Sequence, residues 1–169
     1  MTKAVLKAES FAEQRAYAER VKALALKKYG KTPNACVITF GCQQNVSDSE
    51  KLKGQLSNMG YKITDNIEDA QFIIFNTCAV REHAEDRVYG NIGTTKALKK
   101  SNPDIIVAVC GCMAQRQSVA EKIRKSYPYV DMVFGTQAGF RLPEFIYKRL
   151  SGSKRVFDLT LDNGEIPED

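Results

Sequence analysis

Three short apolar runs, each followed closely by a cysteine, place the strongest constraint on the fold of this chain. The runs are continuous rather than alternating and are rich in β-branched residues, which is typical of strands buried on both faces of a parallel sheet. They comprise residues 36–40, 72–75 and 105–109. Polar segments with helical periodicity lie between them, so the sequence predicts a strand–helix–strand order and an open α/β sheet.

A cysteine lies just beyond each of these runs. Cys42, Cys78 and Cys112 are separated by 36 and 34 residues in the sequence. In open α/β sheets the loops at the carboxyl ends of the strands bind ligands. We therefore expect these three thiols to converge on one site.

The other patterns complete an α/β fold with a mostly parallel open sheet of about five strands, flanked by helices and preceded by an N-terminal amphipathic helix. Further short strands are expected at residues 61–64 and 131–134, and helices at residues 9–29, 47–59, 80–99, 114–126 and 142–150. The second helix is predicted to begin at Ser47, which opens an S-x-x-E capping box. Its amino-terminal dipole would favour a thiolate at Cys42.

The chain divides into three expected segments. Residues 1–33 form an N-terminal helical extension, residues 34–150 the α/β domain and residues 151–169 a linker. The first segment carries eight Lys or Arg against three Glu, whereas the remainder balances at seventeen of each sign. A basic helix there could contact RNA phosphate, but a mixed-charge helix is more often a solvated face packed on its own domain, which is the interpretation we favour.

Composition indicates one globular domain that stays out of the membrane. The chain has 169 residues, of which 43% are hydrophobic and 27% charged, and these values are typical of soluble proteins. No stretch approaches 18 apolar residues, and the charged amino terminus lacks the apolar segment of a signal peptide. We expect a cytoplasmic monomer, in which the five cysteines serve metal binding or catalysis rather than disulfides.

The cysteines fall into two groups. Cys36 and Cys110 lie within or at the margin of apolar runs and are interpreted as buried small hydrophobes. Cys42, Cys78 and Cys112 follow the runs, beside polar residues and glycine, where packing does not require sulfur.

Three thiolates without a matched fourth ligand fit either zinc completed by water or histidine, or an iron–sulfur cluster with one open iron. His83, the single histidine, is interpreted as a solvated or hydrogen-bonding residue. The C-x-x-C spacing of zinc ribbons is absent, and so are the dinucleotide, phosphate-loop and hydrolase motifs. Spacing alone therefore favours the cluster, with zinc left open.

At these residues the chain resembles the N-terminal domain of the radical-SAM methylthiotransferases. The resemblance covers roughly residues 35–137 and is carried by three motifs in order, Thr39-Phe40-Gly41-Cys42-Gln43-Gln44-Asn45, Asn76-Thr77-Cys78-Ala79-Val80-Arg81 and Gly111-Cys112-Met113-Ala114-Gln115. Residues 76–90 most resemble the bacterial branch that modifies N6-isopentenyladenosine at position 37 of tRNA.

The resemblance implies that Cys42, Cys78 and Cys112 bind a [4Fe-4S] cluster whose unique iron holds an exogenous sulfur species from a sulfur donor. That sulfur would be methylated from S-adenosylmethionine and inserted as methylthio at C2 of the adenosine, which makes tRNA the partner. A fourth thiolate would close the iron that must accept sulfur. Residues expected to support the cluster through amide and hydroxyl groups are Gln43, Asn45, Asn76 and Thr77.

The sequence departs from this family in one large respect. The family's second [4Fe-4S] cluster, held by a C-x-x-x-C-x-x-C motif, cleaves S-adenosylmethionine, and no such motif occurs here. We therefore expect this chain alone to be inactive and residues 151–169 to lead toward an absent radical-SAM domain. The alternative is a zinc-binding structural or interaction module on an α/β scaffold.

Overall fold

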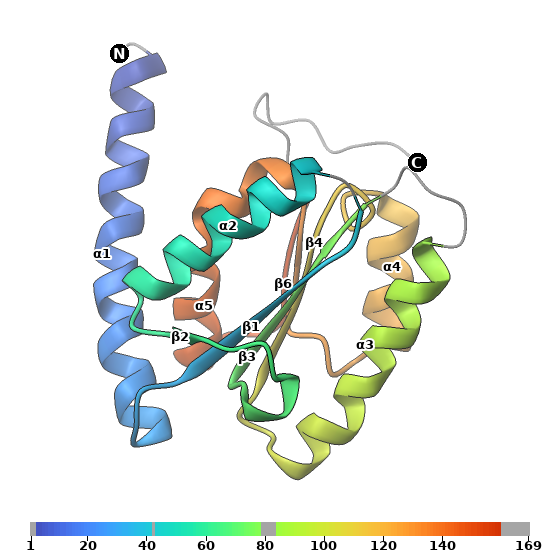
Figure 1. Cartoon of the computed structure of the whole chain (residues 1–169). Coiled ribbons are helices and arrows are strands. Elements are labelled where there is room, and N and C mark those ends of the chain that lie inside the picture. The colour runs from blue at the N-terminus through green and yellow to red at the C-terminus, as the bar shows by residue number, and fades with distance from the viewer. Residues whose placement is uncertain (1–2, 42, 79–83, 160–169) are drawn as a thin grey trace.

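The protein is a three-layer α/β structure built on a six-stranded, all-parallel sheet with the strand order β2-β1-β3-β4-β5-β6 (Figure 1). The computed structural model describes residues 3–41, 43–78 and 84–159. The strands are β1 Asn34–Thr39, β2 Lys62–Ile63, β3 Phe72–Thr77, β4 Ile106–Gly111, β5 Met132–Phe134 and β6 Val156–Asp158. The helices are α1 Lys3–Tyr29, α2 Gln43–Asn58, α3 Ala84–Ser101, α4 Gln117–Ser126 and α5 Leu142–Leu150, with short 3₁₀ turns η1 Ile67–Asp69 and η2 Thr136–Arg141.

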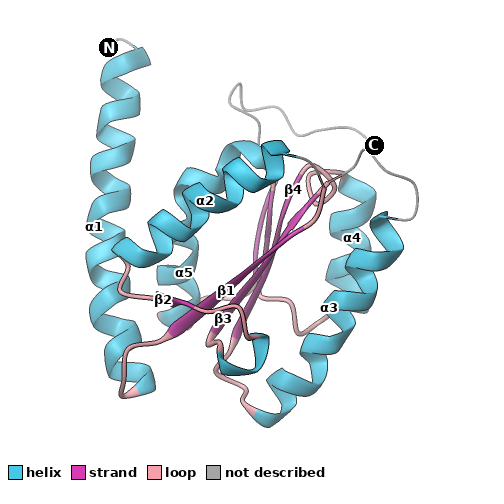
Figure 2. Cartoon of the chain, viewed as in Figure 1, coloured by secondary structure: helices cyan, strands magenta, loops and turns pink. Residues whose placement is uncertain are grey.

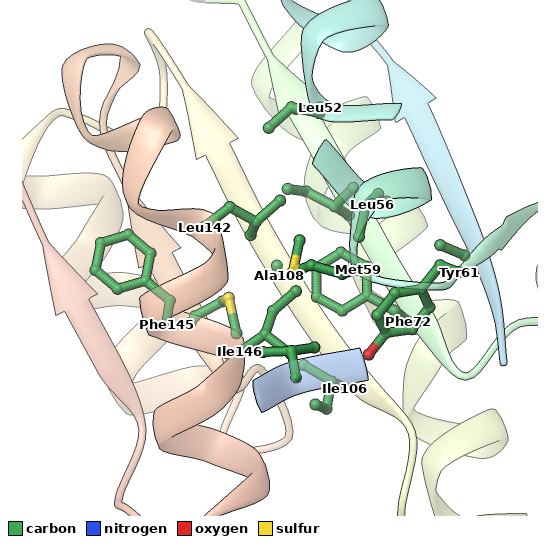
Figure 3. Close-up of a cluster of buried hydrophobic side chains, with 14 of the residues drawn as sticks. Leu52, Leu56, Met59, Tyr61, Phe72, Ile106, Ala108, Leu142, Phe145 and Ile146 are labelled. Atoms are coloured by element: carbon green, nitrogen blue, oxygen red, sulfur yellow. The ribbon is translucent and has the colours of Figure 1, made fainter. Parts of the chain in front are cut away.

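The central strands are buried on both faces, as their continuous apolar runs predict. Every residue of β3 and β4 is buried. Side chains alternate between two cores: Phe72 and Ile74 face α1, α2 and α5, whereas Ile73 and Phe75 face α3 and α4. Figure 2 shows these helices covering the two faces of the sheet, and Figure 3 shows the first core in close-up.

Helix α1 packs on this body through a narrow stripe. Its buried residues recur at helical spacing, at Gln14, Ala18, Val21 and Ala25. The ring of Tyr17 lies 5.3 Å from that of Tyr147 on α5. The first helix is therefore joined to the last one.

The register brings three strand ends together. In the parallel ladder Thr39 pairs with Asn76, and Thr77 pairs with Gly111. Strands β1, β3 and β4 are neighbours and end at the same edge of the sheet. The chain passes from β1 to β2 on one side, and β3 lies on the other, so this edge contains a topological switch point, where open α/β sheets bind ligands.

The fold predicted from the sequence is confirmed, with two main local differences. Helix α2 begins at Gln43 and contains Ser47, so the capping-box prediction was wrong about its start. Strand β6 lies within residues 151–169, where only a linker was expected, and brings the count to six. Three residues are too few to display a period, and β5 provides the pairing that forms this strand. The predicted start of the third helix, residues 80–83, lies outside the described residues.

Among the described helices, none is long and apolar enough to cross a membrane.

Asp131 holds helices from both layers to the sheet. It is 2% exposed, and its carboxylate accepts a hydrogen bond from the Val107 backbone N–H at 2.8 Å. It pairs with Arg149 of α5 at 2.6 Å and also with Lys99 of α3. Burial lowers the pKa of Lys99, and the charge of Asp131 opposes that shift.

We predict that Asp131→Ala lowers the free energy of unfolding by about 3 kcal/mol, because two largely buried cations lose their counter-charge. Urea denaturation measures this loss. The matched control is Asp104→Ala, whose side chain is 61% exposed and lies 3.7 Å from Lys28; its loss should stay below about 1 kcal/mol. Equal losses in the two variants would contradict the assignment.

Glu144 joins α1 to α5. Its carboxylate accepts hydrogen bonds from Gln14 at 3.1 Å, Arg141 at 2.6 Å and Lys148 at 2.9 Å. Burial alone would raise the pKa of Glu144, but these donors outweigh it and lower the pKa to about 2. The carboxylate therefore remains charged in the folded chain well below the pH at which it protonates in the unfolded chain.

This depressed pKa predicts acid sensitivity with a defined sign. The stabilisation is fully present above the unfolded pKa of about 4.3 and is lost as the pH falls toward about 2. The stability of Glu144→Gln should therefore fall less than that of the wild type over this range, as measured by thermal unfolding. Glu50→Gln, which removes an exposed i,i+3 pair with Lys53, should follow the wild-type profile.

Candidate metal centre

The predicted ligands lie at the carboxyl edge of the sheet, as far as the structure describes them. Cys78 directly follows β3 and is 3% exposed. Cys112 directly follows β4 and is exposed. Cys42 lies outside the described residues, between Gly41 and the first residue of α2. His83 also lies outside them.

Gly41 brings the chain before Cys42 against Cys78. Its φ of +112° lies in the region that favours glycine. A Cβ at Gly41 would overlap the Cβ of Cys78 and lie 2.9 Å from its Sγ and 2.8 Å from Asn45 Oδ1. The residue before one predicted ligand therefore touches a second predicted ligand, an approach that only glycine allows.

Gly111 has the same relation to the neighbouring strand. Its φ is +100°, and a Cβ there would overlap the carbonyl oxygen of Thr77 and lie 2.7 Å from the Thr77 nitrogen. Thr77 precedes Cys78, and Gly111 precedes Cys112. The backbones that carry these two cysteines are thus in direct contact.

Buried amide side chains join the loops at this edge. Asn45 of α2 donates from Nδ2 to the Thr77 carbonyl at 2.8 Å. Asn76 of β3 donates from Nδ2 to the Asn45 carbonyl at 2.9 Å and to Ser49 Oγ at 3.0 Å. The Ser49 hydroxyl also lies 2.6 Å from Thr39 Oγ1 at the end of β1. The start of α2 is therefore fixed to the ends of β1 and β3.

Two further side chains fix the loop that carries Cys112. Thr77 Oγ1 donates to the Cys110 carbonyl at 2.6 Å and accepts from the Ala114 N–H at 3.3 Å. Gln115 Oε1 accepts from the Thr136 N–H at 3.1 Å and from its hydroxyl at 2.9 Å. This loop is consequently held on one side by β3 and on the other by the segment after β5.

The four supporting residues predicted from the sequence differ in burial. Asn45, Asn76 and Thr77 are buried, at 4%, 2% and 0% exposure, and are hydrogen-bonded to the backbone around the cysteines. Gln43, the first residue of α2, is exposed. Three of the four therefore lie where they can hold the geometry of the cysteine loops.

The two cysteines interpreted as structural are both buried. Cys36 is 3% and Cys110 is 4% exposed. Burial raises the pKa of both thiols, which favours the neutral form. The Cys110 thiol donates to Asn76 Oδ1 at 3.9 Å, and both residues behave as small apolar core residues.

The donor set fits an iron–sulfur cluster. Thiolates are the preferred ligands of such clusters, and the amino-terminal dipole of α2, a 16-residue helix, favours negative charge at this edge. Within residues 3–41, 43–78 and 84–159, no three His, Cys, Asp or Glu side chains form a group able to hold a metal ion. Cys42 lies outside that search, and the ligand role of the three cysteines stays a prediction.

Reasoning from the sequence missed Gly41, Gly111, Ser49 and Gln115. The two glycines had a visible signal, because each directly precedes a predicted ligand. Ser49 was read as part of a capping box, although its hydroxyl joins β1 to β3 through Asn76. Gln115 belongs to the third motif, but nothing local indicated its contact with Thr136, which is 21 residues away.

Comparison with known proteins agrees with the sequence motifs. Residues 34–135 match the family described as "Uncharacterized protein family UPF0004". A Caldicellulosiruptor saccharolyticus protein named tRNA-2-methylthio-N(6)-dimethylallyladenosine synthase is 47% identical over 161 residues, which are 94% of this chain and 34% of the relative. Proteins of the same name from Acetivibrio thermocellus and Alkaliphilus oremlandii are 44% and 51% identical over 95% and 77% of this chain, and 34% and 28% of their own.

The chain therefore spans about a third of the length of the curated relatives it matches. Their names confirm the resemblance to the methylthiotransferases that the three motifs predicted. Because the family match covers more than half of the chain, this protein belongs to the UPF0004 family.

Proposed function

We propose that this chain holds a [4Fe-4S] cluster through Cys42, Cys78 and Cys112 as part of a tRNA methylthiotransferase. The observation that carries the proposal is the double glycine contact, in which Gly41 meets Cys78 and Gly111 meets Thr77. These contacts set the residue before Cys42 against Cys78, and the residue before Cys112 against the residue before Cys78. The names of the relatives supply the reaction class, since each is a synthase of a 2-methylthio nucleoside in tRNA.

The cluster, when bound, supplies an iron site at which sulfur is held for transfer to C2 of the adenosine. The residues of the chain bind and orient it. Cys78, buried after β3, gives one thiolate, and Cys112, exposed after β4, gives another at the solvent side. Asn45 and Thr77 fix the backbone beside these ligands, and such outer contacts typically hold ligand geometry.

The complete reaction needs more than this chain provides. We propose that S-adenosylmethionine, a second [4Fe-4S] cluster and a separate sulfur donor act with the cluster site, and that tRNA carrying N6-isopentenyladenosine is the substrate. No C-x-x-x-C-x-x-C motif occurs in the sequence. We therefore expect the 169-residue chain to bind its cluster without turning over tRNA.

Iron content tests the cluster assignment. Anaerobic reconstitution with iron and sulfide should give about four irons per chain, and Cys42→Ala, Cys78→Ala or Cys112→Ala should remove most of them. Iron and sulfide quantification with electron paramagnetic resonance measures this loss. Cys36→Ala is the matched control. It removes a thiol that is buried in the core between the sheet and helices α3 and α4, and it should keep the cluster.

Unchanged iron content in all three variants would refute the cluster assignment. Stoichiometric zinc in the purified chain, lost in the same variants, would instead support a structural zinc module.

The backbone contact at Gly111 can be tested by adding a methyl group there. Gly111→Ala should reduce cluster content severalfold, because a methyl group would displace Thr77 and with it the loops of Cys78 and Cys112. Gly90→Ala in α3, where a Cβ meets no atom within 4 Å, should leave cluster content and fold unchanged. Circular dichroism of the apo chain separates loss of the cluster from loss of the fold, and a fully loaded Gly111→Ala chain would contradict the prediction.

A further inference from the structure

A groove runs beside the candidate metal centre, on the sheet face covered by α1, α2 and α5. Its volume is about 810 Å³, within the range of small-molecule sites. Asn76, Cys110 and Gly111, at the ends of β3 and β4, line it. Phe11 and Arg15 of α1 line it as well. The groove therefore includes residues next to the candidate metal centre and residues of the first helix.

The walls of the groove are largely apolar. Buried Leu52 and Phe134 line it from α2 and β5. Phe11 and Phe140 line it with 44% and 39% of their surface exposed, and their rings meet edge to face at 6.0 Å. Two exposed aromatic rings that line one groove form an apolar surface suited to a ligand.

Two glycines that line the groove border open space. Gly54 of α2 and Gly139 of η2 both line it, and a Cβ at either would meet no atom within 4 Å. In a helix interior, Gly is about 1 kcal/mol less favourable than Ala. The chain thus forgoes helix stability at Gly54, where a side chain would enter open space.

The charges along the groove are few and net positive. Among the described lining residues, Arg15 and Lys51 are cations and Asp48 is the one carboxylate. Asp48 accepts a hydrogen bond from Gln44 at 3.2 Å. The apolar walls suit an uncharged apolar group, and the net positive charge suits a phosphodiester chain that is attached to this group and lies outside the groove.

We propose that this groove binds the branched apolar substituent on N6 of the substrate adenosine. The inference rests on the proposed function, and the substituent is the dimethylallyl group in the names of the relatives. Positions 2 and 6 belong to the same six-membered ring. A base with C2 at the metal centre therefore carries its N6 substituent only a few atoms away, and Gly111, the residue before Cys112, lines the groove.

An apolar side chain of a protein partner would also suit these walls. The nucleoside is favoured by position, because the groove is lined by Asn76 and Gly111, which lie two residues before Cys78 and one before Cys112. A substrate that reacts at the metal centre must come close to these residues.

The test is a nuclear magnetic resonance titration of the ¹⁵N-labelled chain with N6-dimethylallyladenosine and with adenosine. The prenylated nucleoside should bind at least about tenfold more tightly, since a five-carbon group leaves water. The largest amide shifts should fall at Gly54, Gly139 and Thr136, which line the groove. Equal affinities, shifts confined to other surfaces, or no binding at millimolar concentration would each overturn the proposal.

Gly54→Leu should fill the groove and weaken binding of the prenylated nucleoside by about tenfold or more. Gly93→Leu is the matched control, because Gly93 is a helical glycine of α3 that likewise meets no atom within 4 Å and does not line the groove. Its affinity should equal that of the wild type. Circular dichroism shows whether both variants fold, and the wild-type shift map decides the outcome if Gly54→Leu does not.

This test is independent of iron. Titration of the apo chain tests binding in the groove, whereas reconstitution tests the cysteines. Selective nucleoside binding by a chain that takes up no iron would support the groove assignment and refute the cluster. Iron uptake without selective nucleoside binding would support the cluster and refute the groove assignment.

Discussion

The parallel alignment of β1, β3 and β4 is the constraint on which the candidate site depends. Parallel strands must be joined by crossovers, so each strand leaves the sheet at the same edge. The register sets Thr39 beside Asn76 and Thr77 beside Gly111. A shift by one residue would turn Asn76 toward the α3 and α4 core and Phe75 toward α2. The register of β3 therefore also fixes which face the polar side chains at its end meet.

At that edge the buried side chains change from apolar to polar, and these polar groups form hydrogen bonds within the protein. Asn45, Asn76 and Thr77 are almost fully buried, and each has hydrogen-bond partners. A buried amide or hydroxyl that loses its partner costs about 1–3 kcal/mol. Such a network stabilises one arrangement of the loops, because alternatives leave several of these groups unpaired. The described backbone next to Cys78 and Cys112 is therefore held in one arrangement before any ligand binds.

Much of this arrangement could be predicted from local sequence. The continuous apolar runs predicted the central strands, and the cysteines beyond them indicated the edge at which we place the candidate site. The start of α2 could not be predicted, because Ser47 and Glu50 match a capping box although the helix already begins at Gln43. Strand β6 depends on pairing with β5, and Gln115 depends on Thr136. These features arise from contacts between distant segments, which leave no period in the sequence.

Strand β4 connects the two surfaces to which we assign function. Cys110 lines the groove on one face, and Cys112 leaves the strand at the candidate metal centre. Gly111 lies between them and takes part in both surfaces, because it lines the groove and its backbone contacts Thr77. A ligand in the groove would therefore contact the same backbone that positions Cys112. Close-packed protein interiors transmit strain. Occupancy of the groove and the geometry of the candidate metal centre are therefore expected to be coupled through Gly111.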